Sequence, residues 1–80
     1  MKLNEAISSR IRELLSQKNM SQYKLEQLSG LTHNTMLCIV NNRYESCNLK
    51  TLIKIIHALD ITPKEFFDNE YFNMDLIEIE

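Results

Sequence analysis

The 80-residue chain contains only one glycine and one proline, and this shortage limits the folds that it can form. Tight β-hairpin turns need residues that accept positive φ angles, above all glycine, so the chain has few places for hairpins. Its apolar residues recur instead at intervals of three and four positions, which is the spacing of an amphipathic helix. We therefore predict an all-α fold with a single hydrophobic core, since a chain of this length forms one domain.

Capping residues and apolar spacing predict where the helices lie. The five expected helices span about residues 4–18, 21–29, 32–40, 49–58 and 62–68. Their expected N-caps are Asn4, Ser21, Thr32, Asn48 and Thr62. The last helix has the strongest signal, because Pro63 fits the first helical position and Glu65 completes a capping box with Thr62. The second helix should end at Gly30, which accepts the left-handed conformation that closes many helices.

The predicted core combines stripes on two helices with apolar pairs at helix starts. The stripe of the first helix consists of Leu3, Ile7, Ile11, Leu14 and Leu15. Its other faces carry Arg10, Arg12, Glu13 and Lys18. The stripe of the fourth helix consists of Leu49, Leu52, Ile53, Ile56 and Leu59. The apolar pairs, which we expect to staple helix starts, are Met20 with Leu25, Leu31 with Met36 and Ile61 with Phe66.

The second and third helices are separated by so few residues that they must cross at a steep angle, as in a helix-turn-helix. The segments "MSQYKLEQLSGLTHNTMLCIVNN" and "NLKTLIKIIHALDITPKEFF" extend this pattern. Together they resemble the lambda repressor-like helix-turn-helix domain of Cro/cI-type phage repressors and XRE family bacterial regulators, over about residues 5–67. The positions that carry the resemblance are Gln22, Leu25, Ser29, Gly30, Leu31, Thr35, Ile39, Ala58 and Leu59.

The sequence departs from the family pattern around the end of the third helix. Many members place an acid there, paired with an arginine late in the first helix, and follow it with a glycine. These positions are Val40, Leu15 and Asn42 in this chain. An apolar pair can replace a buried ion pair without loss of stability, so we expect Leu15 and Val40 to be core residues. Asn42 should adopt the left-handed turn in place of the glycine.

Residues 27–42 carry no formal charge, although charged residues make up 25% of the chain. The residues of this run that should face the core are Leu28, Leu31, Thr35, Met36, Ile39 and Val40. The resemblance implies that the third helix enters the major groove of DNA. The residues then predicted to read bases are Thr32, His33, Asn34, Leu37, Cys38 and Asn41. The predicted phosphate contacts are Ser21, Gln22, Tyr23, Lys24, Arg43, Asn48 and Lys50.

Charge divides the chain into two parts, although its net charge is only -2. Residues 1–67 contain all nine Lys and Arg with six Asp and Glu, whereas residues 68–80 contain five acids and no Lys or Arg. We therefore predict a mildly basic DNA-binding domain at 1–67 and an acidic tail at 68–80. The tail also carries Tyr71, Phe72, Met74 and Leu76. Three interpretations follow: packing on the domain, a dimer contact by helix or edge strand, or a frayed end.

The cysteines and histidines argue against catalysis and metal binding. Cys38 and Cys47, with His33 and His57, lack the spacing of a zinc site, and no oriented base accompanies a candidate nucleophile. We expect no enzyme activity, no cofactor, no metal and no small-molecule ligand. The sequence has no apolar stretch of membrane-spanning length, so we expect no membrane partner and a cytoplasmic location.

These patterns favour a sequence-specific, double-stranded DNA-binding transcriptional regulator whose third helix reads the major groove. We expect a repressor that binds a palindromic operator as a homodimer, because such domains usually occupy two half-sites. The alternative is a protein-interaction module on the same scaffold, such as an antitoxin or antirepressor whose acidic tail holds a partner protein.

Overall fold

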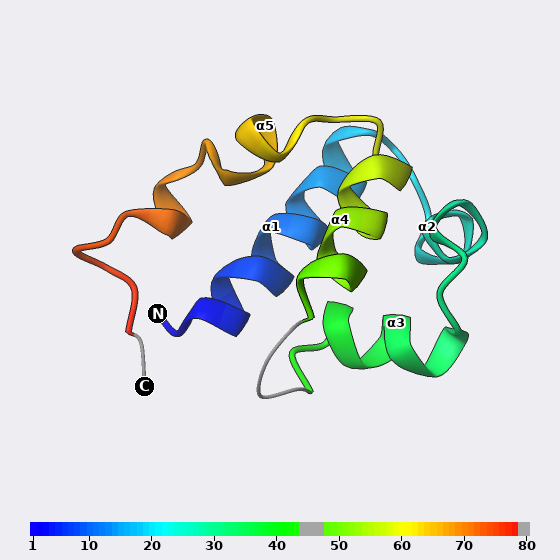
Figure 1. Ribbon diagram of the computed structural model, residues 1–80, viewed down its shortest axis with the longest axis horizontal. Helices are drawn as coiled ribbons and strands as arrows, with labels where there is room; N and C mark the ends of the chain where they lie inside the picture. Colours follow the sequence, from blue (N-terminus) through cyan, green and yellow to red (C-terminus); the bar gives the residue numbers. More distant parts are fainter. Residues whose placement is uncertain (44–47, 79–80) are drawn as a thin grey trace.

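The computed structural model describes residues 1–43 and 48–78, and the regular secondary structure within these ranges is helical apart from one isolated bridge between Lys2 and Glu78. The helices are α1 (Leu3–Gln17), α2 (Gln22–Ser29), α3 (His33–Val40), α4 (Leu49–Ala58), α5 (Pro63–Phe67) and the short 3-10 helix η1 (Glu70–Phe72). In Figure 1, α1 and α4 cross the centre, with α2 and α3 on one side and α5 with the C-terminal segment on the other. The predicted five-helix fold is confirmed. Cys47 and part of the loop expected after the third helix lie outside the described residues.

Side-chain caps start four of the five α-helices, as the sequence predicts. Backbone N–H groups donate, at 2.8–3.2 Å, to side-chain oxygens of Ser21, Thr32, Asn48 and Thr62. Gly30 ends α2 with a φ of 73°, and Asn42 follows α3 with a φ of 56°. Both predicted left-handed positions are therefore confirmed, and local interactions set where these helices begin and end.

The predicted cap of the first helix is wrong. α1 begins at Leu3, one residue earlier than expected, and its N-cap is Lys2 instead of Asn4. The reason is a contact far along the chain, where the N–H of Glu78 donates to the carbonyl of Met1 at 2.9 Å. This bond holds the first two residues in an extended conformation, so the helix starts directly after them. Leu3, predicted in the core stripe, is exposed at the start of the helix.

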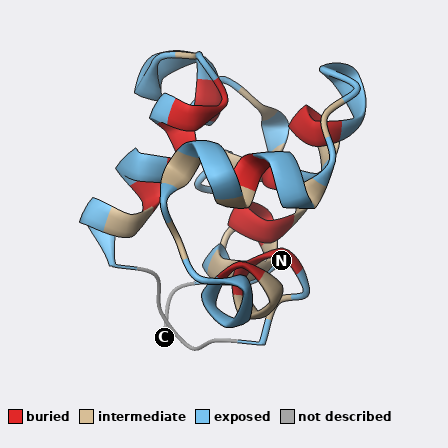
Figure 2. Cartoon of the chain, turned by 90° about the vertical axis from the view of Figure 1, so that its right-hand side faces the viewer, coloured by how far each residue is buried: buried red, intermediate tan, exposed pale blue. Residues whose placement is uncertain are grey.

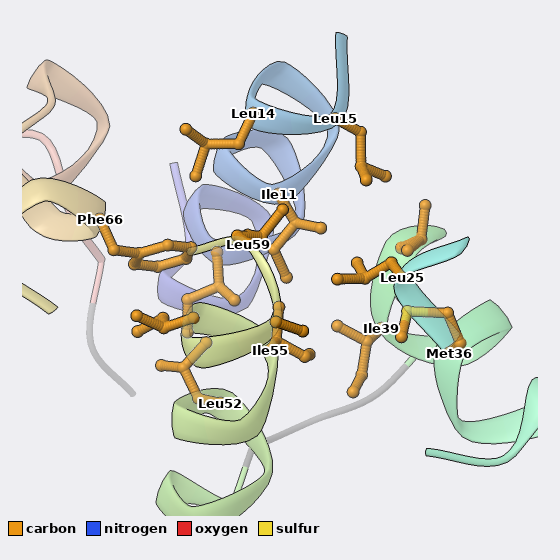
Figure 3. Close-up of a cluster of buried hydrophobic side chains, with 14 residues drawn as sticks. Ile11, Leu14, Leu15, Leu25, Met36, Ile39, Leu52, Ile55, Leu59 and Phe66 are labelled. Atoms are coloured by element: carbon orange, nitrogen blue, oxygen red, sulfur yellow. The ribbon is translucent and has the colours of Figure 1, made fainter. Parts of the chain in front are cut away.

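The hydrophobic core lies where α1, α4 and α5 meet α2 and α3, as Figure 3 shows. Its largest fully buried apolar side chains are Phe66, Ile11, Leu25, Met36, Ile55, Ile56 and Leu59. Met20, Leu31 and Ile61 are partly buried against this cluster, as the predicted staples require. Leu15 and Val40 are both buried in it, so the prediction that they are core residues is confirmed.

The predicted stripe on α4 is partly wrong. Leu49 and Ile53 are 70% and 41% exposed, whereas Ile55 is fully buried. The residues that α4 turns toward the core are Leu52, Ile55, Ile56 and Leu59. They follow the i, i+3, i+4, i+7 series of a single stripe, and the two exposed residues lie beside it. Figure 2 shows buried and exposed positions alternating along the helices in this way.

Arg10 is a buried residue, although its place in the sequence predicts a polar face of the first helix. Its guanidinium donates to the backbone carbonyls of Glu65 at 2.9 Å and Phe66 at 2.8 Å, and it pairs with the carboxylate of Glu13. Both carbonyls lie toward the C-terminal end of α5, where carbonyls lack partners within the helix. A five-residue helix that is unstable alone is thereby tied to α1. Sequence spacing does not show this, because the long arginine side chain reaches across to another helix.

Residues 69–78 pack back toward α1. The side-chain amide of Asn69 and the hydroxyl of Tyr71 donate to the two carboxylate oxygens of Glu13, at 2.9 and 3.2 Å. The ring of Phe72 is half-buried, with its centroid 5.8 Å from that of Phe66. Of the three interpretations of the tail, the structure shows packing on the domain for this part, while residues 79–80 are not among those described.

The carboxylate of Glu13 raises the pKa of Tyr71 above its ordinary value of 10.0, because it repels the phenolate and accepts a hydrogen bond from the neutral hydroxyl. The folded protein therefore holds this proton more tightly than the unfolded chain does. The resulting stabilisation is complete below about pH 10 and is lost as the pH rises through the pKa of the folded state.

We expect Arg10→Met to lower the free energy of unfolding by about 2–3 kcal/mol, because it removes the buried guanidinium that donates to two backbone carbonyls and pairs with Glu13. Lys18→Met, which changes an exposed cation at the end of the same helix, should change that free energy by less than about 0.5 kcal/mol. Urea titrations followed by circular dichroism measure both values. Equal losses in the two variants would contradict the structural role of Arg10.

We expect Tyr71→Phe to be less stable than the wild type near neutral pH, since the bond to Glu13 is lost. Above about pH 10 the variant should lose less additional stability than the wild type, because it has no phenol with a raised pKa at this position. Urea titrations at several pH values across this range test the prediction. Tyr23→Phe, at an exposed tyrosine of α2, is the control, and identical alkaline behaviour of the two variants would show that the Glu13 contact has no effect.

Candidate nucleic-acid interface

α3 presents a polar, uncharged face to solvent. The helix buries Met36, Ile39 and Val40. Among the residues predicted to read bases, the exposed ones are Thr32, His33, Asn34 and Asn41. Leu37 and Cys38 are half-buried and offer only part of their side chains. The structure therefore brings all six together on or beside the outer side of one short helix.

Two residues that the sequence predicts to lie in the core are exposed to solvent instead. Thr35 is exposed in the first turn of α3, where its hydroxyl accepts a hydrogen bond from that of Thr32 at 2.9 Å. Leu28 is 48% exposed, because the single buried residue of α2 is Leu25 and an eight-residue helix offers the core a narrow stripe. Thr35 thus extends the exposed polar surface of α3.

The turn between α2 and α3 is short and closed by its own hydrogen bonds. The N–H of Gly30 donates to the carbonyl of Glu26 at 3.0 Å, and the N–H of Leu31 donates to the hydroxyl of Ser29 at 3.4 Å. Leu31 is half-buried against the core, and Thr32 caps α3 directly after it. These contacts fix the start of α3 relative to the end of α2.

A hydrogen-bond network crosses from α2 to α3 beside this turn. The Nδ1 atom of His33 lies 2.9 and 3.1 Å from the two carboxylate oxygens of Glu26. The side-chain amide of Gln22 donates to the same carboxylate at 3.4 Å. Gln22 and His33 therefore share a partner, Glu26, that the sequence alone does not reveal. The only signal for it is the i, i+4 spacing of Gln22 and Glu26 on one helix.

The cationic residues predicted to contact phosphates flank α3 and do not lie on it. Lys24 is exposed on α2, Arg43 is exposed just after α3, and Lys50 is exposed in the first turn of α4. Tyr23 is also exposed on α2, and its hydroxyl accepts a hydrogen bond from the amide of Gln27 at 2.7 Å. The positive charges thus lie on the segments next to α3 in the chain, while α3 itself carries no Lys or Arg.

The other predicted phosphate contacts already have partners within the protein. Ser21 and Asn48 accept the capping bonds of α2 and α4, and Gln22 donates to Glu26. A hydroxyl that accepts a capping bond still has its own hydrogen, so Ser21 keeps a donor for an anion. The backbone N–H groups at the start of α2 lie next to it, where a helix favours negative charge.

Arg12 is a cation that the sequence places on a polar face and that the structure uses at the end of α3. Its guanidinium donates to the carbonyl of Val40 at 2.8 Å and to the hydroxyl of Ser9 at 3.3 Å. The hydroxyl of Ser8 donates to the neighbouring carbonyl of Ile39. α1 therefore holds the carbonyl end of α3, where the helix dipole favours a cation.

Other kinds of site find little support in the described part of the chain. Within residues 1–43 and 48–78, no group of three or more His, Cys, Asp or Glu side chains could hold a metal ion. No helix in the same ranges is long and apolar enough to cross a membrane. Cys38 has a free thiol that is half-buried, and His57 is exposed on α4.

Two short helices joined by a fixed turn, with an exposed polar second helix and cations around it, define the class of helix-turn-helix nucleic-acid-binding domains. Residues 10–70 match the family of Cro/C1-type HTH DNA-binding domains. The chain belongs to this family, which confirms the resemblance drawn from its sequence. Comparisons with curated proteins and with solved structures gave no match.

Proposed function

We propose that the protein is a sequence-specific transcriptional repressor that binds double-stranded DNA with α3 in the major groove. The observation that carries this proposal is the uncharged, polar outer face of α3, which exposed cations flank on α2, after α3 and on α4. Base edges offer hydrogen-bond donors and acceptors, which suit such a face, whereas phosphates attract cations. Repression requires only that the bound domain occupies a promoter.

We propose that the bases are read by Thr32, His33, Asn34, Leu37, Cys38 and Asn41. Asn34 can pair with N6 and N7 of adenine, His33 can bond a base edge through a ring nitrogen, and Leu37 can meet a thymine methyl. Each good contact of this kind discriminates between bases by about 1–3 kcal/mol. The small Cys38 side chain contributes mainly shape.

The proposed phosphate contacts are Ser21, Gln22, Tyr23, Lys24, Arg43, Asn48 and Lys50. Three of these residues are cationic, namely Lys24, Arg43 and Lys50. If each neutralises one phosphate, the logarithm of the binding constant should fall with the logarithm of the salt concentration with a slope of about -3 per subunit. This electrostatic contribution to the binding free energy of one subunit is small. Binding by two copies is therefore favoured, because the phosphate contacts of both subunits then add.

We further propose that two copies bind a palindromic operator as a homodimer, with half-sites about one helical turn apart. In this assignment residues 1–67 bind DNA and residues 68–80 contribute to the contact between copies. The support is that Met74 and Leu76 remain exposed, although other residues of the same segment contact α1 and the core. Exposed apolar side chains close together in sequence favour contact with another protein surface.

We expect Asn34→Ala to relax sequence choice at one base pair in each half-site, with about a five- to hundredfold loss of discrimination there, because a base-specific contact is removed. Arg43→Ala should weaken binding to all sequences alike and reduce the salt slope by about one per subunit, because it removes a phosphate contact. Selection from a pool of random duplexes, followed by titration at two salt concentrations, measures both effects.

A different result would favour the alternative function. If the wild-type protein retained no duplex even at low salt, while a protein partner co-purified with it, an antitoxin or antirepressor role would replace DNA reading. If Asn34→Ala and Arg43→Ala had the same uniform effect on all sequences, DNA binding would stand but α3 would not be the reading helix.

We expect a palindromic duplex to bind two copies with a salt slope of about -5.4, against about -2.7 for a single half-site, because two subunits double the phosphate contacts. Sedimentation of the complexes gives the number of copies, and titrations over a range of salt give the slopes. Replacing Met74 and Leu76 with Ser should weaken association between copies if the tail forms their contact. Association that is unchanged by this double substitution would assign the dimer contact to another surface.

A further inference from the structure

The carboxylate of Glu26 faces the ring of His33 across the helix-turn-helix. The His33 side chain is 70% exposed at the start of α3, whereas that of Glu26 is only 11% exposed. One ring nitrogen, Nδ1, lies within hydrogen-bond distance of both carboxylate oxygens. The half-buried carboxylate of Glu26 therefore contacts the Nδ1 edge of the exposed His33 ring. The other edge of the ring, with Nε2, is left available to a ligand.

We infer that Glu26 is a positioning residue that determines which nitrogen of His33 meets a base and whether that nitrogen accepts or donates. This inference rests on the proposed function, because it assumes that α3 reads the major groove. Glu26 does not itself contact DNA in this arrangement. It acts through the orientation and the tautomer of the imidazole.

When the His33 ring is neutral, the chemistry of the pair leaves one consistent assignment. An ionised carboxylate has no hydrogen to donate, so Nδ1 of His33 must carry the hydrogen that joins it to Glu26. In a neutral imidazole only one nitrogen carries a hydrogen, and the bond that it makes sets the role of the other. Nε2 is then an acceptor, and its partners in the major groove are the amino groups of adenine and cytosine.

The position of the carboxylate is itself restrained. Glu26 lies on α2 one turn after Gln22, whose side-chain amide donates to it at 3.4 Å. Its low exposure and its two partners on different helices limit the rotamers that it can adopt. A group that orients a reading side chain must be held in this way, because a freely rotating acid would leave the ring free as well.

Glu26 should have two effects on DNA binding that can be measured separately, one on overall affinity and one on base discrimination. A carboxylate beside a DNA-binding face repels phosphates whatever the base sequence, so its removal should strengthen binding to all duplexes alike. Loss of the oriented ring should change discrimination at one base pair only. Glu26→Gln removes the charge and keeps the size, and its amide can accept from or donate to Nδ1, so both tautomers of His33 become possible.

The test compares wild type, Glu26→Gln, His33→Ala and the double variant on four palindromic duplexes that differ at the base pair where His33→Ala relaxes discrimination. At about pH 8, where an ordinary imidazole is neutral, the wild type should prefer adenine or cytosine at this position. Glu26→Gln should reduce that preference about five- to tenfold and raise overall affinity. In the His33→Ala background the same substitution should raise affinity without changing base preference.

Glu70→Gln is the matched control, because it removes an exposed acid from η1, outside the helix-turn-helix. It should leave the base preference unchanged. Urea titrations verify that all variants are folded. An unchanged base preference in Glu26→Gln, or an equal change in the His33→Ala background, would overturn the inference while leaving the proposed function in place. Failure of the wild type to select any duplex would overturn both.

Nuclear magnetic resonance gives a second readout that requires no DNA. Long-range proton–nitrogen spectra should show the hydrogen of the neutral His33 ring on Nδ1 in the wild type and a mixture of tautomers in Glu26→Gln. His57, the second histidine of the chain, lies exposed on α4 and serves as the internal reference. A hydrogen on Nε2 of His33 in the wild type would refute the assignment whatever the DNA results.

Discussion

The burial of Met36, Ile39 and Val40 is the interaction on which the presentation of α3 depends. An isolated helix of eight residues is not stable in water, because its few hydrogen bonds do not offset the cost of nucleation. α3 also contains His, Asn, Thr, Ile and Val, which favour helices only weakly. Tertiary packing therefore keeps it helical. Because packing also fixes the backbone beneath the outer side chains, less conformational entropy remains to be lost on binding.

The contacts that complete this packing use cations inside the protein. Arg10 bonds carbonyls at the end of α5, and Arg12 bonds a carbonyl at the end of α3. Both guanidinium groups thus serve the fold, in a chain that has nine Lys and Arg and a net charge of -2. Non-specific affinity for DNA grows with the number of phosphates that a protein neutralises. In the proposed complex, base contacts must therefore supply a large share of the binding energy.

The sequence predicts local features and misses those that depend on distant neighbours. The caps at Ser21 and Thr32 and the turn at Gly30 involve residues within four positions, so residue type and spacing suffice. Arg10 bonds a carbonyl 56 positions away, which only packing decides. At the candidate site, helical spacing identifies the exposed reading candidates on α3 but misassigns the exposed Thr35 to the core. It also misses the carboxylate partner of His33, because residue spacing does not show whether an acid on a short helix contacts another side chain or only water.

The position of Glu26 beside the proposed base-reading face of α3 shows how selectivity differs from affinity. A specific site competes with a large excess of other sequences, so the ratio of the two affinities matters more than either value. A carboxylate that only repelled phosphates would lower both affinities equally and leave this ratio unchanged. A carboxylate that also orients a base-contacting ring offsets part of this loss at the specific site alone, and so increases the ratio of the two affinities. In the proposed complex, the bond between Glu26 and His33 is therefore the feature that converts an unfavourable charge into discrimination between sequences.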